Sequence, residues 1–402
     1  MTLAREDVVV IGAGQAGLAT SYELTQLGVD HVVLERGRVG QSWRDRWDSF
    51  CLVLPNWTLK LPGHEFAGDD PDAFLPRDGI VQYLEAYAGK AGRIREGINV
   101  TSLEAAPDGG FVLRTEEGEI QARMVVLSTG AYQRPHRPPA AGTLPAGMHV
   151  IDAEGYTNPG ALPEGGVLVV GSGQTGCQIA EEVQQSGRET FLACGKAPWI
   201  PRRIGERDTI AWVTETPFFE QPVSALPSPL AKLTGNPQAS GRDGGHDLHF
   251  RTLQAIGVQL LGRFDHADES RVYFAADLAE SVAFGDSRYA DIKGLIHAFC
   301  KSAGISPPEI ADPPAFDATA PESIELSRLG TVVFTSGFRP DYSRWVNIPT
   351  FDEMGFPLHH EGQSTVAPGL FFVGVHFLRK RKSSTLLGVG EDAGIVANQL
   401  AP

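Results

Sequence analysis

The sequence predicts an α/β protein with two Rossmann-like dinucleotide-binding domains, the second of which is inserted into a split first domain. A G-x-G-x-x-G motif occurs twice, each time between an apolar, β-branched run and a stretch of helical period. The two copies are 159 residues apart, and such a repeat is far more specific than a single copy. Buried-strand patterns return at 331–337 and 369–374. We therefore expect a first domain at 1–158 and 328–402 and a second domain at 159–327.

The first motif lies near the start of the sequence. Val8–Ile11 are apolar throughout, which is typical of a strand buried on both faces. Gly12 permits a tight turn after this strand, Gly14 leaves room for a diphosphate against bare backbone, and Gly17 lets the next helix approach the strand. The other cofactor-binding candidates of this turn are Gln15 and Ala16.

A carboxylate follows the second predicted strand at the distance that a ribose contact requires. His31–Leu34 form that strand, and Glu35 comes 18 residues after Gly17. A fixed carboxylate repels a 2′-phosphate, so this site favours FAD or NAD over NADP. Its place near the N-terminus favours FAD, by resemblance to two-dinucleotide flavoproteins, and Arg36 belongs to the same candidate site. The alternative is a glycine-rich turn in an α/β domain that binds nothing.

A Trp-rich stretch at 37–63 follows and has no clean period. In a dinucleotide-binding domain, this segment can wrap the far end of the cofactor. Trp43 and Arg44 offer a flat face and a cation that suit an aromatic ring system. The alternative is that the tryptophans of this stretch pack in the core. The other candidates here are Gln41 and Ser42.

The second motif repeats the pattern of the first. A buried strand at 166–170 precedes Gly171, Gly173 and Gly176, and a helical stretch follows. We therefore expect a second dinucleotide at this turn. The other candidates of the turn are Ser172, Gln174 and Thr175.

The charges after the second motif differ in sign from those after the first. No acid follows the strand that ends at Ala193, whereas Lys196, Arg202 and Arg203 lie soon after it. Lys196 and Arg202 could neutralise a 2′-phosphate, which favours NADPH over NADH. The alternative is that these cations are solvated loop charges.

The C-terminal segment offers a helix start. Glu391 and Asp392 precede a helix from Ala393, and free N–H groups at such a start suit the anionic side of a reduced flavin ring. The alternative is a plain acidic N-cap. A basic run at 379–382 either contacts an anionic group or forms a solvated loop. Glycines at strand ends or at this helix start complete the cofactor-binding candidates: Gly130, Gly337, Gly374 and Gly390.

Composition limits the classes of partner. Apolar residues make up 42% of the 402 residues and charged residues 21%, as in an ordinary globular protein, and the net charge is −15. This charge argues against a nucleic-acid partner, and no run of 18 apolar residues exists to span a membrane. The chain enters its first strand directly, without room for a signal peptide, so we expect a cytoplasmic protein. The four cysteines lack C-x-x-C spacing, so we expect reduced thiols, no metal site and no flavin-disulphide pair.

Seven segments together carry a family resemblance: GAGQAG, LER, GQSW, LVLPNWTLKLPG, GSGQTG, TSGFRPD and GLFFVG. They make the chain similar to the flavin-containing monooxygenases, above all to bacterial members and to the plant indole-pyruvate flavin monooxygenases. The resemblance covers most of the chain and is weakest at 204–325. It implies an enzyme in which NADPH reduces FAD and the reduced flavin traps O₂ as a C4a-(hydro)peroxyflavin. One oxygen atom then passes to a small organic substrate.

The resemblance also identifies a catalytic candidate. Asn56 matches an asparagine near the flavin whose amide could bind the peroxide or the nicotinamide. N- or S-oxygenation is favoured because it needs no protein acid or base. The family fingerprint F-x-G-x-x-x-H-x-x-x-Y/F is incomplete at 144–156. The alternative is therefore an NAD(P)H-dependent flavin reductase or oxidase that passes electrons to a quinone, a partner or O₂.

Two features of the chain stay open at this stage. Residues 204–250 show little period, and their length exceeds that of a usual loop, so we expect a lid or a substrate-facing insertion. The chain could form a homodimer.

Overall fold

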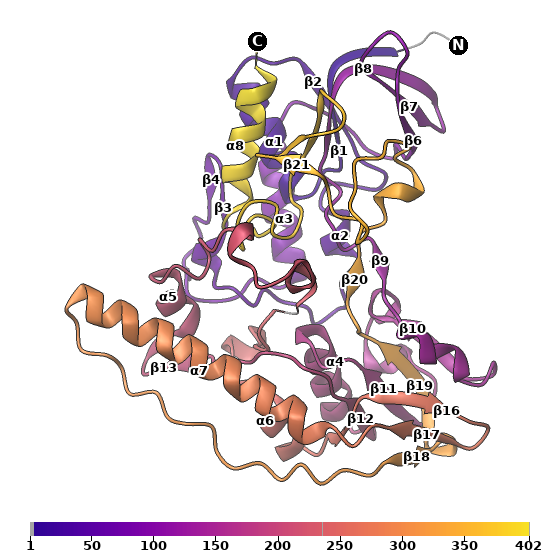
Figure 1. The fold of residues 1–402 in the computed structure, drawn as a ribbon, viewed down its shortest axis with the longest axis vertical. Coiled ribbons are helices and arrows are strands. Elements are labelled where there is room, and N and C mark those ends of the chain that lie inside the picture. Colours follow the sequence, from indigo (N-terminus) through magenta and orange to yellow (C-terminus); the bar gives the residue numbers. More distant parts are fainter. Residues whose placement is uncertain (1–3, 235, 402) are drawn as a thin grey trace.

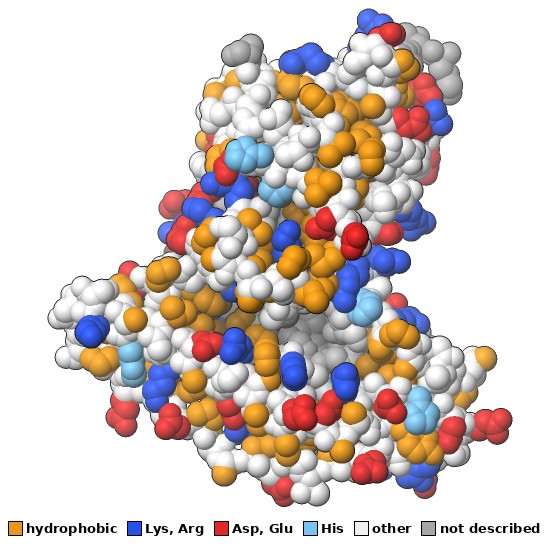
Figure 2. Space-filling view, viewed as in Figure 1, with side chains coloured by type: hydrophobic (Ala, Val, Ile, Leu, Met, Phe, Trp, Pro, Cys, Tyr) orange, Lys and Arg blue, Asp and Glu red, His pale blue; other side chains and the backbone are white. Residues whose placement is uncertain are grey.

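Two lobes, each built on a parallel β-sheet, make up the computed structural model (Figure 1), which describes residues 4–234 and 236–401. The molecule narrows between the lobes, and Lys and Arg side chains lie at the edge of this waist (Figure 2). No helix within the described ranges is long and apolar enough to cross a bilayer.

The first sheet surrounds the strand that precedes the first glycine motif. β1 (Ala4–Ile11) lies at its centre, with β2 (His31–Leu34) and β8 (Gly118–Leu127) parallel to it on either side. β23 (Leu370–Phe372) extends the parallel part beyond β8, so the strand predicted at 369–374 does return to this sheet. The sheet also contains β5 (Arg93–Arg95), β6 (Val100–Ala105), β7 (Phe111–Thr115), β21 (His359–His360) and β22 (Gln363–Ser364).

The two faces of this sheet are covered differently. Val8 and Val10 of β1 share a core cluster with three helices, whereas Val9 and Ile11 pack on the opposite face with the β6–β7 meander. All four side chains are buried, as the apolar pattern of the strand predicts. The helices are α1 (Gln15–Gln26), α3 (Arg77–Ala88) and α8 (Val389–Leu400), and the lobe also contains α2 (Gln41–Arg44), β3 (Lys60–Leu61) and β4 (His64–Glu65).

The second sheet surrounds the strand that precedes the second glycine motif. β11 (Gly166–Val170) lies between β12 (Thr190–Ala193) and β19 (Leu329–Phe334) in a five-stranded parallel sheet of order β10-β19-β11-β12-β15. α4 (Gln174–Gln185) and α6 (Phe250–Ala255) contribute to the core on one face. The lobe also contains β10 (His149–Asp152), β13 (Arg203–Ile204), β14 (Arg207–Asp208), α5 (Thr209–Thr214), β15 (Gln259–Leu261), β16 (Phe264–Ala267), β17 (Arg271–Phe274), α7 (Leu278–Ala303) and β18 (Ser323–Glu325).

The bounds of the second lobe differ from the expected 159–327. β10, at the edge of its sheet, begins at His149, and β19, in its interior, ends at Phe334. The strand predicted at 331–337 therefore belongs to the second sheet and not to the first. A fully apolar strand pattern fits the interior of either parallel sheet, so the pattern cannot tell which sheet the strand joins.

Two chain crossings join the lobes, and they pair with each other. The chain leaves the first lobe through β9 (Arg134–Pro135) and returns through β20 (Phe338–Arg339), and these strands are antiparallel (Figure 1). The amide of Gln133 donates to Gly130 O at 2.6 Å and accepts from Asp341 N at 2.7 Å. The junction is therefore a hydrogen-bonded ribbon and not two independent linkers.

A part of residues 204–250 reaches from the second lobe to the first. Val223 N donates to Arg379 O at 2.8 Å, and Arg381 N donates to Gln221 O at 3.0 Å. We call residues 219–223 the strap. The strap runs alongside the segment that leads into α8, and the role of residues 204–250 as a lid or a substrate-facing insertion stays a prediction.

Candidate functional site

The first glycine turn has a geometry that only glycine allows. Gly12 has a φ of +104°, and a Cβ on Gly17 would lie 1.8 Å from the carbonyl oxygen of Gly12. The end of β1 and the start of α1 therefore touch backbone to backbone. A Cβ on Gly14, in contrast, would meet no atom within 4 Å. The fold does not need a glycine at position 14, whereas a ligand lying against the backbone does.

The second turn repeats this geometry. Gly171 has a φ of +111°, a Cβ on Gly176 would lie 1.9 Å from Gly171 O, and a Cβ on Gly173 would meet nothing within 4 Å. Both helices that follow, α1 and α4, begin without a side-chain cap. An open glycine at an uncapped helix start is the arrangement that binds a dinucleotide diphosphate. The residues present therefore fit one dinucleotide in each lobe.

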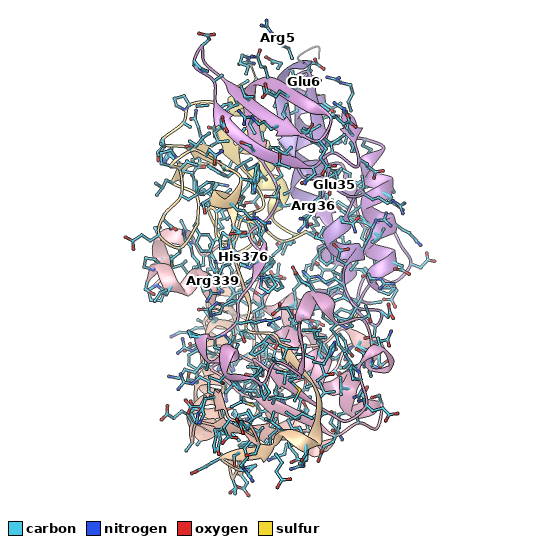
Figure 3. The ribbon with its side chains drawn as sticks, turned by 90° about the vertical axis from the view of Figure 1, so that its right-hand side faces the viewer. Arg5, Glu6, Glu35, Arg36, Arg339 and His376 are labelled. Atoms are coloured by element: carbon cyan, nitrogen blue, oxygen red, sulfur yellow. The ribbon has the colours of Figure 1, made fainter. Side chains whose placement is uncertain are left out.

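Glu35 supports the first turn. Its Oε2 accepts a hydrogen bond from Ala13 N at 2.7 Å, its Oε1 accepts one from Gly37 N at 2.9 Å, and the side chain is buried. Each carboxylate oxygen has a further lone pair for a ribose hydroxyl. Arg36 is exposed beside it, and both residues lie in the first lobe above the junction (Figure 3).

Gln15 connects three segments at this turn. Its amide nitrogen donates to Ser384 O at 3.2 Å, and its amide oxygen accepts from Trp43 Nε1 at 3.0 Å. Trp43 is half-buried and also packs against the first-lobe core, so it serves the core and borders the turn. A Cβ on Gly374 would lie 2.4 Å from the Ala16 Cβ, so these two small residues let the loop after β23 approach α1.

The remaining candidates of the Trp-rich stretch make local contacts. The Gln41 amide donates to Asp45 Oδ1 at 2.7 Å, Arg44 pairs with Glu85 of α3, and Ser42 is exposed. These contacts hold α2 in place and direct neither Gln41 nor Arg44 toward the glycine turn. Their role in cofactor binding stays a prediction.

Asn56 is buried and already engaged. Its amide nitrogen donates to Asp70 O at 3.0 Å, and its amide oxygen accepts from Leu75 N at 2.7 Å. The side chain therefore anchors the 70–75 segment. One amide hydrogen is left over, so the catalytic role of Asn56 toward a bound ligand stays a prediction.

The two acids near the start of α8 do not cap it, which corrects the acidic N-cap alternative. Glu391 pairs with Lys380 and Lys382, and Asp392 accepts from Arg379 at 2.9 Å. Three cations of the basic run at 379–382 are thus neutralised within the protein, while Arg381 donates to the Gln221 amide oxygen, so the run is not a solvated loop. Because both carboxylates are engaged in these ion pairs, Glu391 and Asp392 can influence a ligand only indirectly, by positioning the basic residues.

The start of α8 is satisfied by backbone groups rather than by a side-chain cap. Val389 N donates to Thr385 O at 2.9 Å, and Glu391 N donates to Gly388 O at 3.2 Å. A Cβ on Gly390 would lie 2.8 Å from Pro62 Cδ, so this glycine lets the helix pack against the 60–62 segment. Contact between this helix start and the anionic side of a flavin ring stays a prediction.

The structure contradicts the role expected for Arg202. The side chain is 1% exposed and donates to Val53 O at 2.8 Å and to Asp208 Oδ1 at 2.5 Å. Its guanidinium also lies over the Phe74 ring at 4.9 Å. The guanidinium therefore has no exposed face for a 2′-phosphate. Its contacts connect the second lobe to residues 52–75. Lys196 is exposed, and its contact with a 2′-phosphate stays a prediction.

Polar residues of the second turn shape its surroundings. Ser172 Oγ donates to Gly195 O at 3.1 Å, and the Gln174 amide donates to Pro237 O at 3.1 Å. Thr175 is half-buried on the first turn of α4. Ser172 and Gln174 thus hold the walls around the turn, and direct contact of these three residues with a dinucleotide stays a prediction.

Three residues at the junction were not recognised in the sequence. The Tyr132 hydroxyl is hydrogen-bonded to His376 Nε2, and His376 Nδ1 is hydrogen-bonded to Ser384 Oγ at 3.1 Å. Tyr132 is 48% exposed, and burial lowers the pKa of His376 to about 4, so the imidazole is neutral near pH 7. His376 lies two residues after Gly374, which ends a predicted strand, and this position was the only signal in the sequence.

The glycine turns make a paired prediction. Gly14→Ala should leave the urea midpoint of the flavin-free protein unchanged but abolish retention of FAD, because the new methyl group occupies ligand space only. Gly17→Ala should destabilise the fold by about 1–3 kcal/mol or more, because its Cβ overlaps backbone. Flavin content per chain and urea unfolding measure the two effects. Full FAD retention by Gly14→Ala would contradict the site.

The two cations of the second lobe make another pair. Arg202→Gln should lower the free energy of unfolding by about 3–5 kcal/mol, because Asp208 is left buried without its partner. Lys196→Glu should leave stability unchanged and raise the KM for NADPH more than that for NADH. Urea unfolding and steady-state kinetics with both nucleotides test these outcomes. Equal changes in the KM values for NADPH and NADH would contradict the assignment of Lys196 to the 2′-phosphate site.

Comparison with known proteins agrees with this geometry. A family described as pyridine nucleotide-disulphide oxidoreductase matches residues 9–218, a little over half of the chain. An uncharacterized oxidoreductase CzcO-like of Geobacillus kaustophilus is 31% identical over 405 residues, which cover 98% of each chain. The indole-3-pyruvate monooxygenase YUCCA1 of Oryza sativa subsp. japonica is 32% identical over 190 residues, which cover 46% of each chain.

A solved structure shares the fold over the whole chain. The flavin-containing monooxygenase from Stenotrophomonas maltophilia superposes with a TM-score of 0.67 at 18% identity, over 99% of this chain and 98% of that one. The sequence matches and the two glycine turns lead to the same conclusion. The chain belongs to the pyridine nucleotide-disulphide oxidoreductase family and is an FAD-dependent oxidoreductase that uses NADPH, with sequence and fold similar to those of flavin monooxygenases.

Proposed function

We propose that this enzyme consumes NADPH and O₂ to transfer one oxygen atom to a small organic substrate, with N- or S-oxygenation favoured. The proposal depends on one observation: the chain has two dinucleotide turns, but its thiols are poorly suited to disulphide chemistry. All four cysteines are free and buried, burial raises the pKa of Cys51 to about 11, and it raises that of Cys177 well above its usual range. The nucleophile in disulphide chemistry is a thiolate, and the raised pKa values of Cys51 and Cys177 disfavour this form at neutral pH. O₂ is therefore a more suitable acceptor for the electrons of the reduced flavin than a disulphide.

The chain's own residues bind and shield the cofactors. The open Gly14 and the start of α1 bind the diphosphate of FAD, Glu35 binds its ribose, and the start of α8 faces the ring. Gly173 and the start of α4 do the same for NADPH, with Lys196 toward the 2′-phosphate. FAD supplies the electron transfer and the reaction with O₂. The protein supplies position and exclusion of water.

The strap contributes to this exclusion. Glu220 pairs with Lys380 at 2.6 Å and also with Lys382, and Arg381 lies 4.3 Å from the centre of the Phe218 ring. These contacts hold residues 219–223 against the segment that leads into α8. A closed strap keeps bulk water away from the ring side of the first site. A cytoplasmic location and a homodimer stay predictions of the sequence.

Three chemical classes of substrate are candidates for this enzyme. The partly matching YUCCA1 relative is named for indole-3-pyruvate, an aromatic 2-oxo acid. We therefore include this acid beside a tertiary amine and a thioether as candidate substrates. N- and S-oxygenation are favoured over the acid, because these reactions need no acid or base from the protein.

The direct test follows the oxygen atom. The flavin-loaded enzyme is supplied with NADPH, ¹⁸O₂ and each candidate substrate, and product, NADPH and H₂O₂ are counted. We expect one labelled oxygen atom in the product for each NADPH consumed with the correct substrate class. NADPH consumption that no substrate accelerates, with all electrons in H₂O₂ or in an added quinone, would instead support the reductase or oxidase alternative. Gly14→Ala, which lacks FAD, is the background control.

The strap makes a prediction about coupling. Glu220→Gln removes the ion pairs with Lys380 and Lys382, so the strap should open more often and the share of NADPH that ends as H₂O₂ should rise several-fold. Glu215→Gln is a matched control, because Glu215 pairs with Arg207 away from the strap. The measurement is H₂O₂ per NADPH with substrate present. Equal H₂O₂ yields for both variants would contradict the shielding role.

A further inference from the structure

Two arginines oppose each other across the ribbon that joins the lobes. In the antiparallel register, Arg339 of β20 is the direct partner of Arg134 of β9, so both side chains lie on the same face of the ribbon. His136 follows on the same crossing, and its backbone N–H donates to Gly337 O at 2.8 Å. Like charges placed directly opposite each other destabilise a β pair. The fold therefore keeps an arrangement that is unfavourable without a counter-charge.

The chain itself offers little counter-charge there. Within residues 4–234 and 236–401, Arg339 has no carboxylate at ion-pair distance, and Arg134 has only Asp341, at 4.0 Å. Arg339 donates one bond to Phe338 O at 2.9 Å, which leaves its other N–H groups available. Burial, followed by repulsion from Arg134, lowers the pKa of Arg339, and burial with both arginines lowers that of His136. The two arginines thus lack a strong counter-charge even though the protein as a whole has a net charge of −15.

This arginine pair lies between the two cofactor turns. Thr335 Oγ1 donates to Gly171 O at 2.6 Å, so the return crossing starts beside the second glycine turn. On its other side, the Phe338 ring lies 5.6 Å from that of Tyr132, which is bonded to His376 in the first lobe. Figure 3 labels Arg339 and His376, both at the level of the junction between the lobes. A ligand group bound at Arg339 therefore lies where the contents of the two lobes meet.

We propose that Arg339, together with Arg134, forms an oxyanion site that receives either a phosphate of the nicotinamide dinucleotide or a carboxylate of the organic substrate. A guanidinium donates two parallel N–H bonds to an oxyanion, and the charge of the ligand offsets the repulsion between the arginines. The proposal rests on the proposed function only for the nature of the ligands. Binding of an oxyanion does not require oxygen transfer.

The test measures binding without turnover. Isothermal titration calorimetry on the oxidised, flavin-loaded protein uses NADP⁺, 3-phenylpropionate and its uncharged amide, 3-phenylpropanamide, as probes. Arg339→Gln should weaken at least one anionic probe by about 10-fold to 100-fold, the range for hydrogen bonds to a charged group. Arg339→Lys should recover only part of this affinity, because it keeps the charge and loses the paired bonds.

The matched control is Arg344→Gln. Arg344 is exposed five residues further along the chain, without an ion pair within the described ranges, and its replacement changes the net charge equally. We expect less than a 2-fold effect from this variant. Equal weakening by both variants would reveal only long-range attraction and would overturn the proposal.

The probes separate the two sources of the oxyanion. Loss confined to NADP⁺ assigns the site to a phosphate, loss confined to 3-phenylpropionate with the amide unaffected assigns it to a substrate carboxylate, and loss of both indicates one site for both. Unchanged binding of both anions by Arg339→Gln overturns the proposal. If that variant does not unfold cooperatively in a thermal scan, Arg134→Gln carries the same comparison. An enzyme that shows this binding pattern but transfers no oxygen contradicts the proposed function alone.

Discussion

Backbone contact at two glycine turns is the constraint on which the rest of this structure depends. In each lobe, a helix approaches the end of a central strand so closely that a Cβ on the last motif glycine would overlap a carbonyl oxygen. This approach places an uncapped helix start at the carboxyl edge of a parallel sheet. Parallel sheets bind their ligands at that edge, and here the two lobes are joined by a ribbon that begins there. The same contact, used twice, thus sets where both cofactors lie.

Charge is distributed so that most of the cations near the site are satisfied within the protein. Arg379, Lys380 and Lys382 pair with acids of α8 and of the strap, Arg381 donates to Gln221, and Arg202 is held by Asp208 and by carbonyl oxygens. These side chains bind the lobes and segments to one another. The cations left for a ligand are few, and Arg339 at the junction is placed between the two turns. Specificity for an anionic group can therefore depend on very few residues in an acidic protein.

The distribution of thiols and helix starts points in the same direction. Burial raises the pKa values of Cys51 and Cys177, which disfavours the thiolates that disulphide chemistry needs, and the imidazole of His376, bonded to Ser384, is neutral near pH 7. The strap covers the segment that leads into α8. Such surroundings suit a reduced flavin that reacts with oxygen away from bulk water.

The sequence by itself determined both glycine turns, the strands before them, Glu35 and the helices that follow, because these features depend on local backbone geometry and on short-range periodicity. It did not determine which sheet receives the strand at 331–337, because an apolar strand fits either interior. Nor did it reveal that Arg202 is buried while Arg339 lies opposite another arginine. Two arginines in loops look the same in a sequence, and only the residues that the fold packs around them set their roles. Tertiary structure decided the lobe bounds, the ion pairs of 379–382, the Tyr132–His376–Ser384 chain and the paired arginines. Each of these joins residues that are far apart in the sequence, and only the packing of the two lobes brings them together.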